Sequence, residues 1–312
     1  MKLRQLNEVL AIVERGSLRA AARQLGTAQS AVTRSIRELE QELGAELFER
    51  SVTGMVLTPV GAALVKRAAA IDSEVHRIRD EVAQLKGQRV GSVSVGLSTA
   101  PHVSLLPRVL GPFERLYPDV RLNIEEGLFP SMEAQLRSGA IDFYVGPVSE
   151  DHISGEFRVE RLMENLRVIL GRPGHPLKAA KSLHDLVDAR WVATSVTVDS
   201  RAELDPVFET EGLPPPKIAL QAHSALTMIV AAASSDLLAL LPQQWLEFAN
   251  STGLLAHIQV KEQIAAPDLC LVTRSSLPLT PIAERLSDQF RKAASNLSRQ
   301  SQTFYAAGPR RS

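Results

Sequence analysis

Residues 27–40 read Thr-Ala-Gln-Ser-Ala-Val-Thr-Arg-Ser-Ile-Arg-Glu-Leu-Glu, and they decide the fold of the N-terminal region. Val32, Ile36, Leu39 and Leu43 recur at steps of four, three and four, which predicts one buried face of a helix. The opposite face carries side chains that can bond to base edges and phosphates in a DNA major groove. We therefore predict a recognition helix. Its expected base or groove-floor contacts are Gln29, Ser30, Thr33 and Arg34, and its expected phosphate contact is Arg37.

The flanking residues predict the rest of a DNA-binding motif. An amphipathic helix ends near Gly16, and Ser17 is a good cap for a second short helix that closes at Gly26. A short turn then joins this second helix to the recognition helix. Two short helices joined by a turn, the second with exposed polar and basic residues, are typical of a helix-turn-helix. Residues 47–58 then predict a small hairpin, or wing, in which Arg50 is the expected phosphate contact.

The distribution of charge makes nucleic acid a local prediction. Lys plus Arg and Asp plus Glu both total 35, so the net charge of the whole chain does not indicate a polyanion-binding protein. Residues 1–37, however, contain seven basic residues and only two acidic ones. A basic excess confined to one region is the electrostatic footprint expected of a DNA-binding module.

Other features of the composition argue against several classes of protein. Cys270 is the only cysteine and lies in an apolar run, so a disulfide or a thiolate metal site is not expected. The seven histidines lack the spacing of a helical zinc pair, and no nucleophile can be paired with a base. No stretch reaches the roughly 18 apolar residues of a membrane span. The sequence therefore predicts a cytoplasmic protein that is not an enzyme and needs no metal or cofactor.

A long helix is predicted after the wing. Pro59 suits a first helical turn capped by Thr58, and a helix to Lys86 would be about 42 Å long. Such a helix either packs on its own domain or pairs with a second copy, and the second interpretation is favoured because a recognition-helix dimer reads two half-sites. The apolar residues alternate steps of four and three, as in a heptad seam. They are Leu64, Ala68, Ile71, Val75, Ile78, Val82 and Leu85.

The residues beyond Gly91 predict alternating strands and helices, which favours a parallel sheet covered by helices. The helices include one over 202–211 and one over 281–297, and the Ser-, Gln- and Arg-rich residues after Ser298 are expected to be mobile. The predicted strands lie near 93–97, 120–124, 141–145, 166–170, 191–194, 218–220, 237–241 and 269–272.

The ordered run from Leu18 to Gly61 resembles the winged helix-turn-helix of LysR-type transcriptional regulators. Two departures are a cap position occupied by Ala28, which either shifts the expected cap to Thr27 or leaves the helix start frayed, and an uncharged wing over 52–55. Weaker signatures extend the resemblance to the effector-binding domain of that family, although Ser234-Ser235-Asp236 stands where members often carry glycines. These signatures are Ser138-Gly139-Ala140-Ile141-Asp142, Gly174-His175-Pro176-Leu177 and Leu240-Leu241-Pro242.

The resemblance implies an N-terminal winged helix-turn-helix over 1–58 and a linker helix over 59–88. It also implies a two-lobed α/β domain of the periplasmic-binding-protein type over 89–298, followed by a mobile tail over 299–312. Lobe one would span about 91–162 and 267–298, and lobe two about 163–266. The expected function is a transcriptional regulator that binds double-stranded promoter DNA as a homodimer through the linker helix, or as a tetramer. The alternatives are an effector-independent DNA-binding repressor and a small-molecule enzyme with a DNA-binding appendage.

Loops at the carboxyl ends of the predicted strands are the expected ligand site. Four loops qualify, over 98–102, 128–131, 195–200 and 222–224, and three of them lead into helices whose N-terminal ends favour anions. If the loops converge between the lobes, as the resemblance implies, the expected effector is a small anion. Apolar walls favour an aromatic carboxylate or sulfonate. The expected contacts are Ser98, Thr99, Pro101, Leu128, Phe129, Ser195, Thr197, Val198 and His223.

Overall fold

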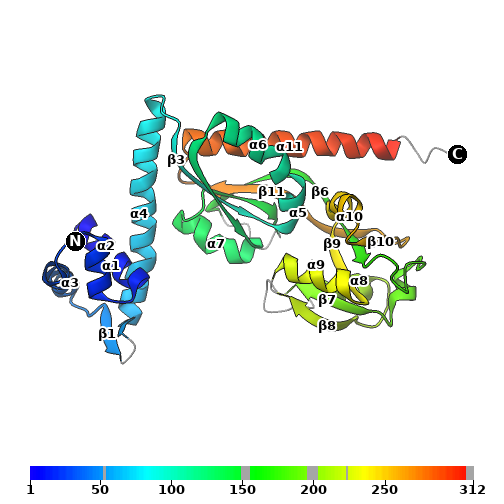
Figure 1. Ribbon diagram of the computed structural model, residues 1–312, viewed down its shortest axis with the longest axis horizontal. Helices are drawn as coiled ribbons and strands as arrows, with labels where there is room; N and C mark the ends of the chain where they lie inside the picture. The colour runs from blue at the N-terminus through cyan, green and yellow to red at the C-terminus, as the bar shows by residue number, and fades with distance from the viewer. Residues whose placement is uncertain (52–53, 149–154, 195–202, 223, 307–312) are drawn as a thin grey trace. The chain divides into compact units, whose positions relative to one another are not determined.

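The computed structural model describes residues 1–51, 54–148, 155–194, 203–222 and 224–306. Side chains are not described at 50–51, 54, 194 and 300–306. The chain forms two compact units (Figure 1). Unit 1 comprises Met1–Gln88 and Arg137–Ala140, and unit 2 comprises Arg89–Leu136 and Ile141–Ser312.

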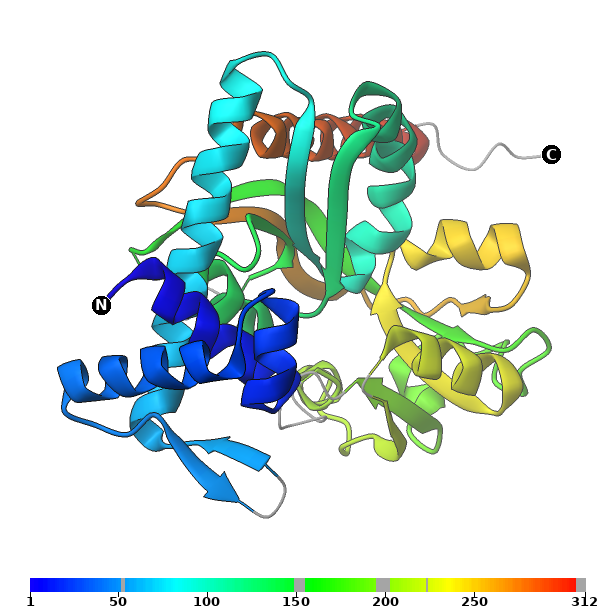
Figure 2. The ribbon, with the colours of Figure 1, turned by 60° about the vertical axis from the view of Figure 1, so that its left-hand side comes forward.

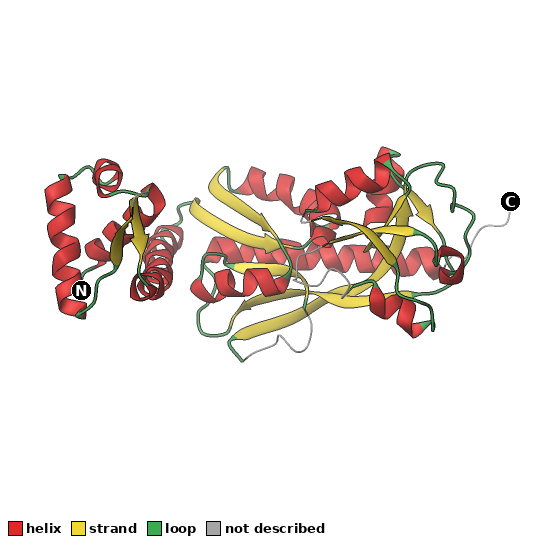
Figure 3. Ribbon diagram, turned by 90° about the horizontal axis from the view of Figure 1, so that it is seen from below, coloured by secondary structure: helices red, strands yellow, loops and turns green. Residues whose placement is uncertain are grey.

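Unit 1 contains the predicted winged helix-turn-helix. Ser17 accepts a hydrogen bond from the Ala20 N–H and so caps the second helix. Buried side chains from the three helices meet Leu47 and Phe48, and they close a small core of their own. Figure 3 shows that the strands of this unit are confined to one hairpin. The elements are α1 (Leu3–Arg15), α2 (Leu18–Gln24), α3 (Gln29–Leu43), β1 (Phe48–Ser51), β2 (Gly54–Leu57) and α4 (Pro59–Leu85).

At the start of α3 the structure excludes one of the two expected alternatives, the shift of the cap to Thr27. The N-cap of α3 is Ala28 and not Thr27, and no side chain accepts a hydrogen bond from the first turn. The chain turns into the helix with the Thr27 N–H bonded back to the Ala22 carbonyl, which places Thr27 before the cap position. The first N–H groups of α3 therefore have no side-chain partner within the described residues.

Gly61 explains how α4 packs against the wing. A Cβ added to this residue would lie 2.1 Å from the backbone oxygen of Leu47. Thr58 fixes the same corner, because its hydroxyl donates to the Glu46 carbonyl and accepts from the Gly61 N–H. Only glycine permits this approach of α4 to the chain entering β1.

Unit 2 is built on a mixed sheet in the order β4-β3-β5-β11-β6-β9-β7-β8, with β10 paired to β6. Its strands are β3 (Val90–Leu97), β4 (Asp119–Glu126), β5 (Phe143–Pro147), β6 (Phe157–Gly171), β7 (Arg190–Thr194), β8 (Lys217–Ala222), β9 (Leu237–Pro242), β10 (Ala256–Ile258) and β11 (Ile264–Arg274). Its helices are α5 (Thr99–Ser104), α6 (Leu106–Leu116), α7 (Phe129–Ser138), the 3₁₀ helix η2 (Leu183–Leu186), α8 (Asp205–Thr210), α9 (Ala225–Ser234), α10 (Trp245–Thr252) and α11 (Pro281–Ala306).

The prediction of a parallel sheet is only partly right. β3 pairs in parallel with β4 and β5, and β7 pairs in parallel with β8 and β9. The long strands β6 and β11 instead run antiparallel to each other and to their other neighbours in the main sheet, β9 and β5. They carry the chain between the two parallel groups without a crossover helix, so antiparallel pairing is the geometry open to them. This arrangement confirms the two-lobed α/β fold.

Each lobe buries apolar residues on both faces of its strands. In lobe one, β3 packs on α6 and α11 through Val93, Phe113 and Phe290, and a second cluster under α7 includes Phe129 and Tyr144. Figure 2 shows α11 in orange to red crossing behind β3 and β4. Lobe two is organised in the same way, with one cluster around Trp191 and Phe208 and another under α9. Helices on both faces leave the strand ends open to ligands.

Several elements differ from the predicted bounds. The helix expected over 202–211 is only the six residues of α8, and α11 continues to Ala306, beyond its expected end at Leu297. The sequence did not predict α10 or β10. α10 buries only Trp245 and Ala249, so its apolar pattern is too short to identify a helix. No helix in the described ranges has the length and apolar run that crossing a membrane requires.

Candidate functional site

The exposed face of α3 forms a shallow groove of polar side chains. Gln29, Ser30, Arg34 and Arg37 are exposed, and Thr33 is half-buried, with its hydroxyl donating to the Gln29 carbonyl at 2.9 Å. Neither Arg34 nor Arg37 has an ion-pair partner among the described side chains. The groove also includes Glu38 and Gln41, which sequence reasoning missed although they continue the same helical face. The Arg50 side chain lies outside the described residues.

A cavity of about 620 Å³ lies in unit 2, within the range typical of small-molecule pockets. The end of β3, the end of β4 and the start of α9 contribute Ser98, Glu126 and Ser224, while the crossing strands contribute Asn165 and Arg167. Three of the four loops predicted from the sequence therefore meet in one cavity. Its apolar lining includes Leu128, Pro130, Pro147, Val207, Met228, Leu240, Leu241 and Pro242.

Two buried side chains at the cavity have unsatisfied polar atoms. Ser98 is 2% exposed, its hydroxyl lacks a well-formed hydrogen bond to any described residue, and its side chain makes no capping bond although it occupies the N-cap position of α5. It lies beside Tyr144, whose pKa is raised well above its ordinary value mainly by burial, so Tyr144 stays neutral. Asn165 is 5% exposed and donates to the Pro267 carbonyl at 3.2 Å, but its Oδ1 has no partner among the described residues. Buried groups of this kind are costly unless a ligand or water completes them.

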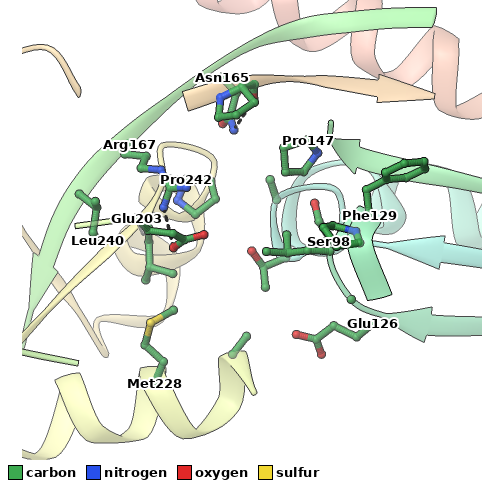
Figure 4. Close-up of a pocket in the computed structure, with 18 of the residues that line it drawn as sticks. Ser98, Glu126, Phe129, Pro147, Asn165, Arg167, Glu203, Met228, Leu240 and Pro242 are labelled. Carbon is green, nitrogen blue, oxygen red and sulfur yellow. Dashed lines mark hydrogen bonds and ion pairs between the residues drawn. The ribbon is translucent and has the colours of Figure 1, made fainter. Parts of the chain in front are cut away.

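Charged side chains lie on both sides of the cavity (Figure 4). On one side, Arg167 Nη1 lies 2.9 Å from a carboxylate oxygen of Glu203, and both side chains are largely shielded from solvent. Glu126 lies on the side of Ser98 and Phe129, away from that ion pair. It has no ion-pair or hydrogen-bond partner among the described residues.

The predicted effector contacts have different outcomes. Ser98, Thr99, Leu128 and Phe129 line the cavity, whereas Pro101 is buried in α5 and does not line it. The predicted contacts Ser195, Thr197, Val198 and His223 lie outside the described residues.

Phe129 lines the cavity, but its side chain contributes mainly to the hydrophobic core. It is 1% exposed, and its ring packs against Phe157 edge-on and against Tyr144 at a tilt, with centroid distances of 5.6 Å in both pairs. Ser224 behaves as a plain helix cap, since its hydroxyl accepts from the Thr227 N–H. For these two residues the structure gives a packing or capping role whether or not a ligand is present.

Sequence reasoning missed the charged residues of the cavity. Glu126 is the last residue of β4, so the strand-end rule that selected the neighbouring loop extended to it. Asn165 and Arg167 lie within β6, a crossing strand that was not expected to reach the ligand site. Glu203 follows the 195–202 segment and had no motif to mark it.

The described residues offer no metal site beside this cavity. No group of three or more His, Cys, Asp or Glu side chains among them could hold a metal ion. Cys270 is buried in β11, where burial raises the pKa of its thiol above the ordinary value. The cavity is thus suited to bind a molecule through polar and apolar contacts.

Comparisons with known proteins cover both units. Residues 3–62 match the model for bacterial regulatory helix-turn-helix proteins of the lysR family, and residues 86–295 match the LysR substrate binding domain. The chain is 26% identical to the transcriptional regulator GbpR of Azospirillum brasilense, covering 94% of this chain and 87% of that one. It is 27% identical to the SDS degradation transcriptional activation protein of a Pseudomonas species, covering 91% and 94%. The solved structure of CbnR, a LysR family transcriptional regulator, has a TM-score of 0.68 at 21% identity and covers 94% of this chain and 99% of its own.

Proposed function

The chain belongs to the LysR family of bacterial transcriptional regulators, and from this premise we propose that it binds promoter DNA through α3 and is switched by a small aromatic carboxylate or sulfonate. The effector would occupy the cavity of unit 2. The observation that carries the proposal is an open cavity at the strand ends of a two-lobed domain, in a chain that also presents an exposed polar recognition helix. Such a regulator acts where the chromosome lies, in the cytoplasm, and needs no catalysis.

The surface of α3 supports contact with DNA. Arg34 and Arg37 are exposed and form no ion pair with a described carboxylate, Glu38 of the same groove included, so their guanidinium groups are available to bases or phosphates. The first N–H groups of α3 lack a side-chain cap, which suits a phosphate at the positive end of the helix dipole. Base contacts are assigned to Gln29, Ser30, Thr33 and Arg34, and phosphate contacts to Arg37 and Arg50.

The linker helix supports assembly into a homodimer, from which a tetramer can be built. Leu64 packs into the core of unit 1, so the start of the predicted seam is used within the chain. Ala68 is also buried and Val75 is half-buried, but four apolar side chains from Ile71 onward are exposed, with Ile78 and Leu85 at 59% and 74%. An apolar stripe at heptad spacing is stabilised by a second copy of the same helix. We call Ile71, Ile78, Val82 and Leu85 the linker seam.

The cavity supports an acidic effector with an apolar body. Arg167 has several N–H donors, of which one is engaged by Glu203, and the remaining donors can bind a carboxylate or sulfonate. Leu128, Met228 and Leu240 provide apolar contacts for a ring. A ligand that contacts both lobes favours the closed arrangement and so shifts the population of conformations that bind the promoter.

Arg34 is the residue with which to test DNA recognition. The Arg34→Ala variant is expected to weaken binding to the cognate site by about 1–3 kcal/mol and to relax specificity at one base position. Arg37→Ala is the matched comparison. It is expected to weaken binding to cognate and random DNA alike and to lower the slope of log affinity against log salt concentration by about 1. Gel-shift titrations on both DNAs measure this. Unchanged cognate affinity in Arg34→Ala would remove Arg34 from the recognition set.

A thermal-shift panel tests the effector proposal. An aromatic acid or sulfonate at about 100 times its Kd is expected to raise the Tm of unit 2 by about 5–10 °C. Arg167→Gln is expected to lose most of that shift, whereas the control Arg172→Gln keeps it. Arg172 pairs with Asp236 and does not line the cavity. Stabilisation by neutral ligands alone would exclude an acidic effector, and no ligand response with intact DNA binding would favour an effector-independent repressor.

A further inference from the structure

We infer that the effector is a hydroxylated carboxylic acid, whose carboxylate binds at Arg167 and whose hydroxyl donates to Glu126 or Asn165. This inference rests on the proposed function, because it specifies the chemistry of the effector in the same cavity. An unsubstituted aromatic acid has no donor for either acceptor, so the two acceptors would favour a hydroxylated acid over its unsubstituted parent.

Asn165 presents an acceptor that no described residue satisfies. Its Nδ2 donates to the Pro267 carbonyl, so the amide is oriented by that bond, because the reverse orientation would bring two oxygens together. Its Oδ1 is buried at the cavity wall and has no partner within the described part of the chain. A buried acceptor of this kind is completed only by a donor that enters the cavity.

Glu126 presents a second acceptor, at the end of β4. Its carboxylate borders the cavity and has no hydrogen-bond or ion-pair partner among the described residues. Its neighbour Glu125 is also exposed but does not line the cavity, because successive strand residues point to opposite faces. An ionised carboxylate accepts hydrogen bonds and cannot donate them, so it discriminates in favour of a ligand with a hydroxyl or amine.

The arrangement of charges sets the polarity of the ligand. Arg167 lies on one side of the cavity, and Glu126 lies on the other side (Figure 4). A carboxylate at Arg167 is attracted, whereas a second anionic group near Glu126 would be repelled. A ligand with a hydroxyl at the end remote from its carboxylate can bond to Arg167 with one group and to Glu126 with the other. Hydrogen bonds to a charged acceptor such as Glu126 are stronger than bonds between neutral groups.

The test measures dissociation constants by isothermal titration calorimetry on the full chain. The probes are two matched series: benzoate, 4-methoxybenzoate, and 3- and 4-hydroxybenzoate; then phenylacetate and its 3- and 4-hydroxy derivatives. A neutral arm uses benzyl alcohol and 4-hydroxybenzyl alcohol. At least one hydroxy acid in each series is expected to bind about 10-fold or more tightly than its parent acid, and the methoxy compound is expected to bind no better than benzoate.

Variants identify the group that reads the hydroxyl. Glu126→Ala is expected to tighten benzoate binding, since a repulsive charge is removed, and, where Glu126 is the acceptor, to bring the hydroxy-to-parent ratio to within about 3-fold. Glu126→Gln keeps an acceptor and is expected to retain part of the preference. Asn165→Ala reports the second acceptor independently. The control Glu125→Ala is expected to keep the wild-type ratio, because Glu125 does not line the cavity.

Each result separates this inference from the proposed function. Equal binding of parent, methoxy and hydroxy acids overturns the inference and leaves an acidic effector in place. A hydroxyl preference that survives both Glu126→Ala and Asn165→Ala also overturns it. Binding of the alcohols without the acids, or of no probe while DNA binding is intact, contradicts the acidic effector of the proposed function, and the inference then fails with it.

Discussion

Replacing Ile78 with lysine is expected to convert the protein into monomers and to weaken operator binding by on the order of 100-fold or more. Ile78 lies in the linker seam and is 59% exposed in a single copy. In a homodimer the substitution occurs on both copies, so two like charges would enter one apolar interface. Monomers lose the gain in affinity that comes from tethering two recognition helices to one duplex.

Sedimentation velocity and gel-shift titration on the same preparations measure both effects. Arg79→Glu is the matched control, because Arg79 is exposed on α4 next to Ile78 but lies outside the seam. We expect this control to remain dimeric. An Ile78→Lys protein that stays dimeric with wild-type affinity would remove α4 from the dimer interface. Loss of helical circular dichroism would show that the helix itself had been damaged, and Ile78→Ser then repeats the test without added charge.

Replacing Phe129 with alanine is expected to destabilise unit 2 by about 3–5 kcal/mol, since a large buried aromatic side chain leaves a cavity behind it. The ring is 1% exposed and packs on Phe157 and Tyr144. Although Phe129 borders the ligand cavity, its main contribution is to the core beneath α7. Loss of stability should therefore exceed any direct loss of ligand contact.

Denaturant unfolding followed by tryptophan fluorescence measures the free energy, because Trp191 and Trp245 are both in unit 2. Leu128→Ala is the comparison, since Leu128 is half-buried and lines the same cavity. We expect it to cost less stability than Phe129→Ala and to weaken effector binding more per unit of stability lost. A Phe129→Ala protein of wild-type stability with lost effector affinity would show that Phe129 is foremost a ligand contact.

The sequence was most informative where structure is local. In unit 1 the helical face of Val32, Ile36 and Leu39, the Ser17 cap and the glycine-ended turns each act within a few residues, and together they predict the winged helix-turn-helix. Of the two alternatives at the start of α3, the shift of the cap to Thr27 is wrong, because the Thr27 N–H bonds back to the Ala22 carbonyl in the turn that ends α2.

The sequence was less informative where contacts are distant. The antiparallel course of β6 and β11 depends on strands more than 90 residues apart, such as Leu271 opposite Glu160. Consequently, Asn165 and Arg167 reach a cavity whose loops were identified without them. Glu126 is the last residue of β4, where the strand-end rule applies, but the loop predicted from the sequence began only at Leu128.

By itself, the sequence determined the helix-turn-helix, the linker helix with its apolar seam, the alternation of strands and helices, and three of the loops that meet at the cavity, while the two-lobed arrangement was expected only from the resemblance to LysR-type regulators. Those features follow from periodicity, capping and strand order, which are properties of short segments. Only the tertiary structure decided that Phe129 belongs mainly to the core, that Arg167 is paired with Glu203, and that Asn165 and Glu126 offer free acceptors. These depend on which distant side chains share one space, and no local pattern encodes that.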